Sequence, residues 1–168
     1  MRPDFARRLP VRQSTKRRPR IVALVISVYH TSREFYLAIR VQSTTVVQPI
    51  ASRLSTPPWL TAVRAAESKK AIDIRVLDLR EVTSFADFFV VCSGANPKQI
   101  QAICEEIGSQ LAERGEHPVS VEGYDNAEWV LADYGDYLIH VFSAKARTYY
   151  DLERLWRHAK VVAIPEAS

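Results

Sequence analysis

The stretch DFFVVCSGANPKQIQAICEEIGSQL, residues 87–111, decides the fold. After Asp87, the run to Cys92 is apolar on both faces of an extended chain, which predicts a central strand over 87–92 that is covered on both sides. A helix entrance follows directly. Asn96 can cap the helix, Pro97 suits its first position, and Gln99 can reach back as in a capping box.

The residues after this entrance have a helical period. Gly115 supplies the residue at which the helix can stop. Burying one aliphatic stripe at roughly 1.5–3 kcal/mol per side chain would hold the helix on a sheet. The stripe consists of Ile100, Ile103, Ile107 and Leu111.

Outward from this unit, the chain alternates between helical and extended periods. Residues 59–70 predict a helix with Trp59, Leu60, Val63 and Ala66 on one face. In residues 71–79, Ile72, Ile74 and Val76 alternate with Asp73 and Arg75, which predicts a strand with one dry and one wet face. Three more strands are expected at 117–121, 128–133 and 137–142, and a last helix at 145–160.

The expected order is helix, strand, strand, helix, three strands, helix. This order predicts an α/β (α+β) fold, with a mixed sheet of about five strands and helices packed on it. The order also invites comparison with the nucleotidyltransferases, so the carboxylates of the chain need inspection.

Charge divides the chain into two segments. Residues 1–56 contain eleven Lys and Arg residues against the two acids Asp4 and Glu34, a net charge of +9. Residues 57–168 contain twelve basic and seventeen acidic residues, a net charge of −5. The split predicts a basic, disordered extension over 1–56, a folded domain over 57–162 and a tail over 163–168.

Three interpretations of the basic extension stand side by side. We favour a solvated tail or an upstream stretch that results from a wrongly chosen start codon. An organelle transit peptide fits the Arg-rich, acid-poor composition, but the β-branched run at 21–28 does not suit it. The third interpretation is an arm that contacts RNA phosphates.

Several classes of protein are excluded by composition. No run of eighteen apolar residues occurs, so no membrane span is expected. Cys92 and Cys104 form neither a zinc spacing nor a disulfide framework, and the four histidines are scattered. We therefore expect buried thiols in a cytoplasmic protein, with no metal site and no cofactor.

A catalytic site is equally poorly supported. Ser93-Gly94 before a helix matches neither glycine-rich phosphate motif, and it is better explained as a strand-to-helix turn. Nucleotidyl transfer needs two carboxylates close together on a strand. Asp133 and Asp136 are separated by a turn, and Asp73 and Asp78 fall on opposite faces of a strand.

His140 lies within a strand that is predicted to be buried on both faces. A lone core histidine is usually satisfied by a carbonyl or a carboxylate, and no nucleophile is identifiably paired with this one. We do not expect an enzyme. A divergent nucleotidyltransferase-like enzyme remains the alternative.

Four spaced signatures carry a family resemblance over residues 59–160. They are D-x-F-V-V-C-S-G at 87–94, E-G-x-x-x-A-x-W at 122–129, D-x-G-D-x-L-I-H-V-F at 133–142 and R-x-Y-Y-x-L-E-x-L-W at 147–156. In this order and spacing they resemble the ribosomal silencing factor (RsfS, Iojap) family. Asn96 stands where the family often has Ser, which keeps the cap, and the first 56 residues have no counterpart in typical members.

The resemblance implies a translation repressor that binds the large ribosomal subunit. Its partner would be a basic ribosomal protein of the uL-fourteen family at the subunit-joining face. Binding there would block docking of the small subunit when nutrients are scarce. The resemblance also implies a nucleotidyltransferase-like fold without catalytic carboxylates. We expect no membrane and no sequence-specific nucleic acid as partners. The sequence does not decide whether the protein forms a homodimer.

Aromatic, Arg and acidic residues near the later signatures are the candidate partner contacts, since aromatic and Arg side chains anchor protein interfaces. Trp129 leads the set. It is interpreted either as a partner contact or as a core residue beneath a helix, and the sequence favours neither. The other candidates are Glu122, Tyr124, Asp125, Asp133, Tyr134, Asp136, Arg147, Tyr149 and Tyr150.

Overall fold

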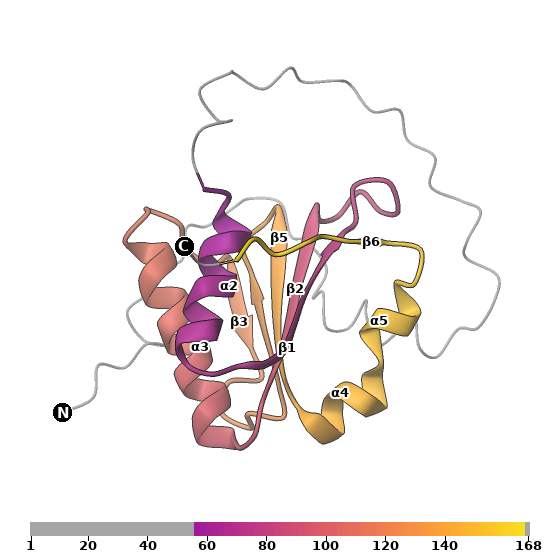
Figure 1. Ribbon diagram of the computed structural model, residues 1–168. Helices are drawn as coiled ribbons and strands as arrows, with labels where there is room; N and C mark the ends of the chain where they lie inside the picture. Colours follow the sequence, from indigo (N-terminus) through magenta and orange to yellow (C-terminus); the bar gives the residue numbers. More distant parts are fainter. Residues whose placement is uncertain (1–55, 167–168) are drawn as a thin grey trace. The chain divides into compact units, whose positions relative to one another are not determined.

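A computed structural model describes residues 56–166 of the chain, which form one mixed sheet with two helices on each side (Figure 1). The expectations for residues 1–55 and 167–168 lie outside these residues. The helices are α2 (Pro58–Ser68), α3 (Pro97–Ala112), α4 (Ala144–Tyr150) and α5 (Leu152–Leu155). The strands are β1 (Ile72–Asp78), β2 (Phe88–Gly94), β3 (Ser120–Glu122), β4 (Trp129–Asp133), β5 (Tyr137–Ser143) and β6 (Lys160–Val161).

The sheet order is β3-β4-β5-β2-β1-β6. The central strands β2 and β5 pair in parallel, with Phe88 opposite Tyr137 and Gly94 opposite Ser143. The other neighbours in the sheet are antiparallel. The predicted mixed sheet is confirmed, and the predicted strand over 87–92 is its centre. The sheet has one strand more than the five expected, because β6 is only two residues long and too short to show a period.

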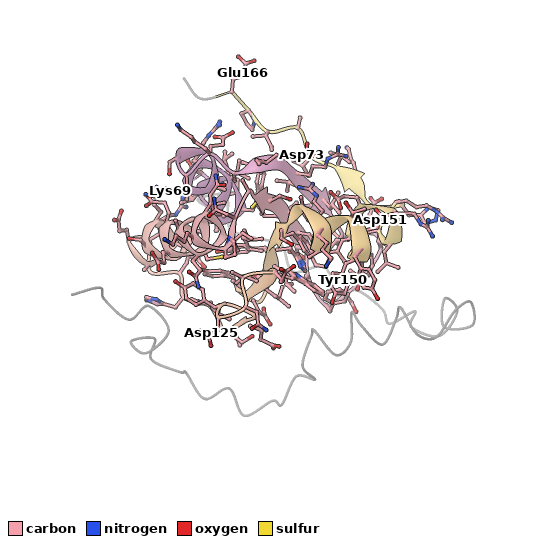
Figure 2. The ribbon with its side chains drawn as sticks, turned by 90° about the horizontal axis from the view of Figure 1, so that it is seen from below. Lys69, Asp73, Asp125, Tyr150, Asp151 and Glu166 are labelled. Atoms are coloured by element: carbon pink, nitrogen blue, oxygen red, sulfur yellow. The ribbon has the colours of Figure 1, made fainter. Side chains whose placement is uncertain are left out.

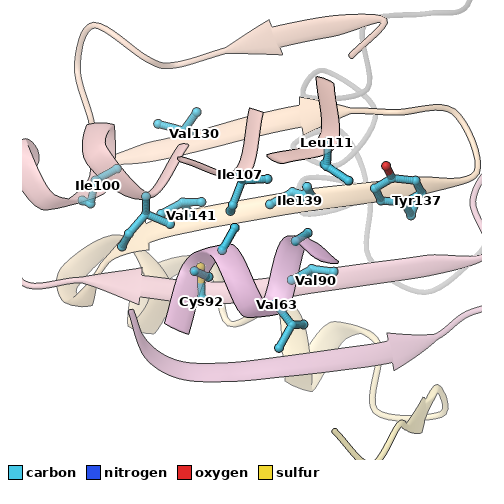
Figure 3. Close-up of a cluster of buried hydrophobic side chains, with 14 of the residues drawn as sticks. Val63, Val90, Cys92, Ile100, Ile107, Leu111, Val130, Tyr137, Ile139 and Val141 are labelled. Atoms are coloured by element: carbon cyan, nitrogen blue, oxygen red, sulfur yellow. The ribbon is translucent and has the colours of Figure 1, made fainter. Parts of the chain in front are cut away.

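One face of the sheet lies against α2 and α3, where the main apolar core forms. Val90 and Cys92 of β2 and Val141 of β5 are at most 1% exposed and belong to this core. Figure 3 shows them beneath the predicted stripe of α3, of which Ile100, Ile107 and Leu111 are labelled. The predicted docking of α3 is therefore confirmed.

The opposite face carries the alternate residues of the same strands, and α4 and α5 lie on this side (Figure 1). Phe89 of β2 packs edge-on against Trp156 at 5.7 Å between ring centroids. Leu152 of α5 is buried here as well. Both faces of β2 and β5 are covered, as their continuous apolar runs predict.

The entrance of α3 has the predicted capping box with one change. The Asn96 side chain accepts a hydrogen bond from the Gln99 backbone N–H at 2.9 Å. Gln99 Oε1 accepts from the Ala95 N–H at 2.8 Å, one residue before the expected donor. Gln99 Nε2 also donates to the carbonyl oxygens of Lys69 and Lys70, both at 3.0 Å. One side chain thus joins the start of α3 to the segment that follows α2.

Three predicted elements need correction. The alternation over 71–79 fails at its start, because Asp73 has a φ of +53° and the register shifts there, which leaves Ile72 50% exposed. The strand expected at 117–121 runs from Ser120 to Glu122. The helix expected at 145–160 is interrupted at Asp151, whose φ of +42° is left-handed, and regular helix ends at Leu155.

Within residues 56–166, no helix is long and apolar enough to cross a membrane.

The cap of α3 gives a first prediction. Asn96→Ala removes the acceptor of the Gln99 N–H and should lower the free energy of unfolding by about 1 kcal/mol. Asn96→Ser keeps an acceptor and should stay close to the wild type. Urea unfolding of both variants measures the difference, and equal stability of the two would contradict the capping role.

Candidate functional site

Trp129 begins β4 and forms part of an aromatic layer on the face opposite α2 and α3. Its ring packs on Phe142 of β5 at 5.1 Å and on Tyr150 of α4 at 4.5 Å. Its Nε1 donates a hydrogen bond to His140 Nδ1 at 3.2 Å. Trp129 is half-buried. The ring therefore has both packing contacts and an accessible part, which suits either interpretation that the sequence left open.

His140 is fully buried and lies edge-on to Phe89, with 4.6 Å between ring centroids. The expected carbonyl or carboxylate partner is wrong, because the Trp129 indole donates to Nδ1. Nε2 then carries the ring proton, and it has no hydrogen-bond partner among residues 56–166. Burial lowers the pKa of His140 to about 3, so the ring is neutral near pH 7.

Arg147 of α4 joins four segments of the fold. Its Nε donates to Glu153 Oε1 at 3.0 Å, and one terminal nitrogen donates to the Asp73 carbonyl at 2.8 Å and to Ser93 Oγ at 3.1 Å. The bulge of β1, the end of β2, α4 and α5 are thereby held together. The hydrogen bonds of the guanidinium all lie within the fold, so we do not count Arg147 among the candidate partner contacts.

Two tyrosines end α4, directly before the interruption at Asp151. Tyr150 packs against Trp129, whereas Tyr149 is 75% exposed and meets Tyr150 edge-on at 5.1 Å. We call Trp129, Tyr149 and Tyr150 the aromatic patch.

The loop between β3 and β4 lies at the same end of the sheet as the aromatic patch. Figure 2 looks onto this end and labels Asp125 and Tyr150. The Tyr124 hydroxyl donates to the Glu105 carboxylate of α3, and the Tyr124 carbonyl accepts from Gln101 Nε2 at 3.2 Å. Tyr124 therefore anchors the loop to α3, and Asp125 is exposed at its tip.

Glu122 and Glu128 flank this loop with further negative charge. Glu122 pairs with Leu131 in the sheet, on the same face as Trp129. Glu128 is exposed, and its carboxylate accepts from Ser143 Oγ at 2.9 Å. Three carboxylates, those of Glu122, Asp125 and Glu128, therefore lie at the same end of the sheet as the aromatic patch.

The remaining candidates lie at the other end of β4, in the turn to β5. Trp129 and Asp133 are the first and last residues of β4, four strand steps or about 13 Å apart. The turn at Gly135 and the β3–β4 loop are at opposite ends of the same strand, so the candidates in these two loops do not form one cluster. Asp133, Tyr134 and Asp136 are therefore separate from the aromatic patch.

Two of these three residues have structural contacts. Asp133 is 4% exposed, and its carboxylate accepts a hydrogen bond from the Gly135 N–H at 2.7 Å. Tyr134 stacks on Tyr137 at 5.0 Å, and burial raises the pKa of its hydroxyl. Asp136 is exposed. It contributes, after burial, to the raised pKa of Asp87.

Sequence reasoning missed His140, Phe142 and Glu128 as parts of this end of the sheet. Strand alternation contained the signal for the first two, because Trp129 pairs with Phe142 in the antiparallel register. Glu128 directly precedes the tryptophan, but nothing in its spacing indicated the bond from Ser143. The Arg147–Glu153 pair spans six positions across an unexpected interruption, so no helical spacing pointed to it.

Catalytic and metal chemistry lack a suitable set of side chains in the described part of the chain. No group of three His, Cys, Asp or Glu residues there could hold a metal ion. Asp78 pairs with Arg80 at 2.6 Å, and the hydrogen bond from Arg80 lowers its pKa. Cys92 is fully buried, which raises its thiol pKa to about 12 and leaves it protonated near neutral pH.

A family model described as "Ribosomal silencing factor during starvation" matches residues 55–168. The chain belongs to this family. Its members are regulatory proteins of translation rather than enzymes. The resemblance in the four signatures is thereby confirmed.

Individual relatives agree with this membership. Ribosomal silencing factor RsfS of Bacillus subtilis is 45% identical over 98 residues, which are 58% of this chain and 83% of that protein. The chloroplastic protein Iojap of Zea mays is 30% identical over 109 residues, 63% of this chain and 46% of that protein. A crystal structure from Chromobacterium violaceum superposes with a TM-score of 0.59 at 33% identity, covering 66% of this chain and 91% of that one.

Two glycines test the close packing of the β3–β4 loop. Gly123 has a φ of +78°, and a Cβ there would overlap the Trp129 carbonyl oxygen. Gly115 has a φ of +77° with nothing within 4 Å of the same position. Gly115→Ala should cost about 1–2 kcal/mol of backbone strain, and Gly123→Ala clearly more, because Trp129 must also move. Thermal unfolding compares the stability of the two variants. Equal losses of stability would show that the close contact between residue 123 and the Trp129 carbonyl does not matter.

The buried histidine predicts a pH dependence of stability. Unfolded His140 titrates near 6.5 and folded His140 near 3. Between these values the unfolded state binds the extra proton, so the free energy of unfolding falls as the pH falls, by up to about 1.4 kcal/mol per pH unit. His140→Gln keeps an acceptor for the indole but does not titrate. Urea unfolding across this window should give the variant a shallower slope, and identical slopes would refute the assignment.

Proposed function

We propose that this chain silences ribosomes by binding the large ribosomal subunit and occluding the face at which the small subunit joins. The aromatic patch and the three carboxylates at its end of the sheet would contact a basic ribosomal protein of the uL-fourteen family. Membership of the silencing factor family is the observation that carries the proposal. Translation in the cytoplasm would fall when nutrients are scarce.

Charge and side-chain chemistry support a basic protein as the direct partner. Residues 57–168 have a net charge of −5, which attracts a basic protein surface. Glu122, Asp125 and Glu128 add negative charge at the same end of the sheet as the aromatic patch. Tyr and Trp are frequent anchors of interfaces, and a standard interface needs about 800 Å² per partner.

The architecture around the patch supports binding with little rearrangement. Tyr150 is held by Trp129, and Tyr124 ties the adjacent loop to α3. Arg147 fixes α4 against the ends of β1 and β2. A surface braced in this way loses little conformational entropy on binding, so more of the contact energy contributes to affinity.

Silencing of this kind requires only that the domain occupies the joining face, and no chemical reaction is needed. A domain docked at the joining face excludes the small subunit by volume alone. The neutral His140, the protonated Cys92 and the paired Asp78 are consistent with a site that performs no chemistry.

Point variants on the surface test the contact. Tyr149→Ala removes the most exposed ring of the patch, and Asp125→Lys reverses a charge at the loop tip. Each should weaken binding to purified large subunits by tenfold or more, about 1.4 kcal/mol, with an unchanged melting temperature. Trp129→Ala is unsuitable, because it also removes the packing on Phe142 and Tyr150.

Asp136→Lys is the matched control, since it makes the same charge change at the other end of the sheet. Sedimentation with large subunits measures binding, and small-subunit joining measures the block. The proposal fails if the wild type does not co-sediment, or if binding of Tyr149→Ala and Asp125→Lys matches that of the wild type. If Asp136→Lys loses as much affinity for large subunits as Asp125→Lys, the effect comes from the overall charge of the domain and not from a local contact.

A further inference from the structure

Three exposed cations lie on the segment that leads from α5 into β6. They are Arg154, Arg157 and Lys160, and we call them the basic segment. They stand out because residues 57–168 as a whole carry a net charge of −5. The aromatic patch and its carboxylates do not include them, so the proposed protein contact leaves these cations unexplained.

The acids near the basic segment neutralise it only weakly. Arg154 is 83% exposed and only 3.9 Å from Asp151, itself 46% exposed, so this ion pair contributes little. Glu153 is engaged by Arg147, and Asp78 mainly by Arg80, although Asp78 also attracts Lys160 more weakly. Arg157 and Lys160 form no salt bridge with any residue in 56–166.

The backbone beneath these cations is fixed. The Arg157 N–H bonds to the Arg154 carbonyl at 3.4 Å, and the Ala159 N–H bonds to the Trp156 carbonyl at 2.8 Å. Lys160 then pairs with Asp78 in the sheet. Trp156 anchors the turn by packing on Phe85 and Phe89, both at 5.7 Å. Three positive charges are thus presented at three-residue intervals from a rigid turn.

We propose that the basic segment contacts RNA phosphates. Exposed Arg and Lys side chains whose internal ion pairs are weak can bind phosphates, with a gain from counterion release. Such contacts position a protein without reading sequence, which agrees with the expectation of no sequence-specific nucleic acid. That the RNA belongs to the large ribosomal subunit rests on the proposed function.

The two surfaces together fit a particle made of protein and RNA. Carboxylates at the same end of the sheet as the aromatic patch favour a basic protein, whereas the basic segment favours a polyanion. Asp151 separates Tyr150 from α5, so the aromatic patch and the basic segment follow one another along the chain. A partner that offers both chemistries side by side would fix the orientation of the domain more firmly than either contact alone.

Salt dependence tests the proposal with the full-length chain. The variant Arg154→Gln, Arg157→Gln, Lys160→Gln should bind protein-free large-subunit RNA more weakly than the wild type. Its plot of log affinity against log salt, from about 50 to about 200 mM, should be shallower by about 2, for three lost contacts. The control Lys69→Gln, Lys70→Gln, Lys98→Gln removes three exposed cations elsewhere. Figure 2 labels Lys69 on the opposite side of the molecule from Asp151.

A photo-crosslinking side chain at position 157 identifies the contact on intact large subunits. An adduct with RNA supports the proposal. A protein adduct without RNA overturns it, and so does an unchanged salt slope for the Gln variant. Equal slope changes for the basic-segment variant and the Lys control also overturn it. If the wild type binds large subunits but the Gln variant keeps the wild-type salt slope, the RNA contact is refuted and the proposed function is unaffected.

If the wild type binds free RNA, with the expected slope change in the Gln variant, but does not bind large subunits, the proposed function is refuted instead.

Discussion

Two parallel strands, β2 and β5, lie next to each other at the centre of the sheet and are covered on both faces. Their pairing from Phe88–Tyr137 to Gly94–Ser143 sets the register for everything around them. One set of alternate residues receives α3 and α2, and the other set receives α4 and α5. Because a parallel pair cannot be closed by a tight turn, the chain must cross between β2 and β5 through α3, β3 and β4. Because β4 is part of this crossover and pairs with β5, Trp129 lies next to Phe142.

The elements that the sequence predicted well are those with long, uninterrupted periods. The strand at 87–92, the capped helix after it and the strand at 137–142 have strong local signals that agree with their burial. The features it did not predict arise from contacts between distant segments. Asp151 adopts a left-handed conformation where the helical period continues, and Arg147 on one side of it meets Glu153 on the other. Strand β6 exists only because β1 is available to pair with two residues.

The candidate site shows the same limit. The candidates in the two loops that flank β4 are close in sequence, but the strand between them places them at opposite ends of the sheet. Residue type suggested that Arg147 is a surface contact, whereas its hydrogen bonds lie inside the fold. Tyr149 and Tyr150 could not be distinguished by spacing, and only the packing on Trp129 separates the braced ring from the exposed one. Family membership, by contrast, rested on ordered signatures that need no three-dimensional information.

The sheet is bounded by very short strands, three residues in β3 and two in β6. Long unpaired edges invite pairing with a further strand, which leads to aggregation, and short edges reduce that hazard. Brief outer strands offer few backbone groups for a further strand to pair with, so the two shortest strands of the sheet stand where unwanted pairing would begin.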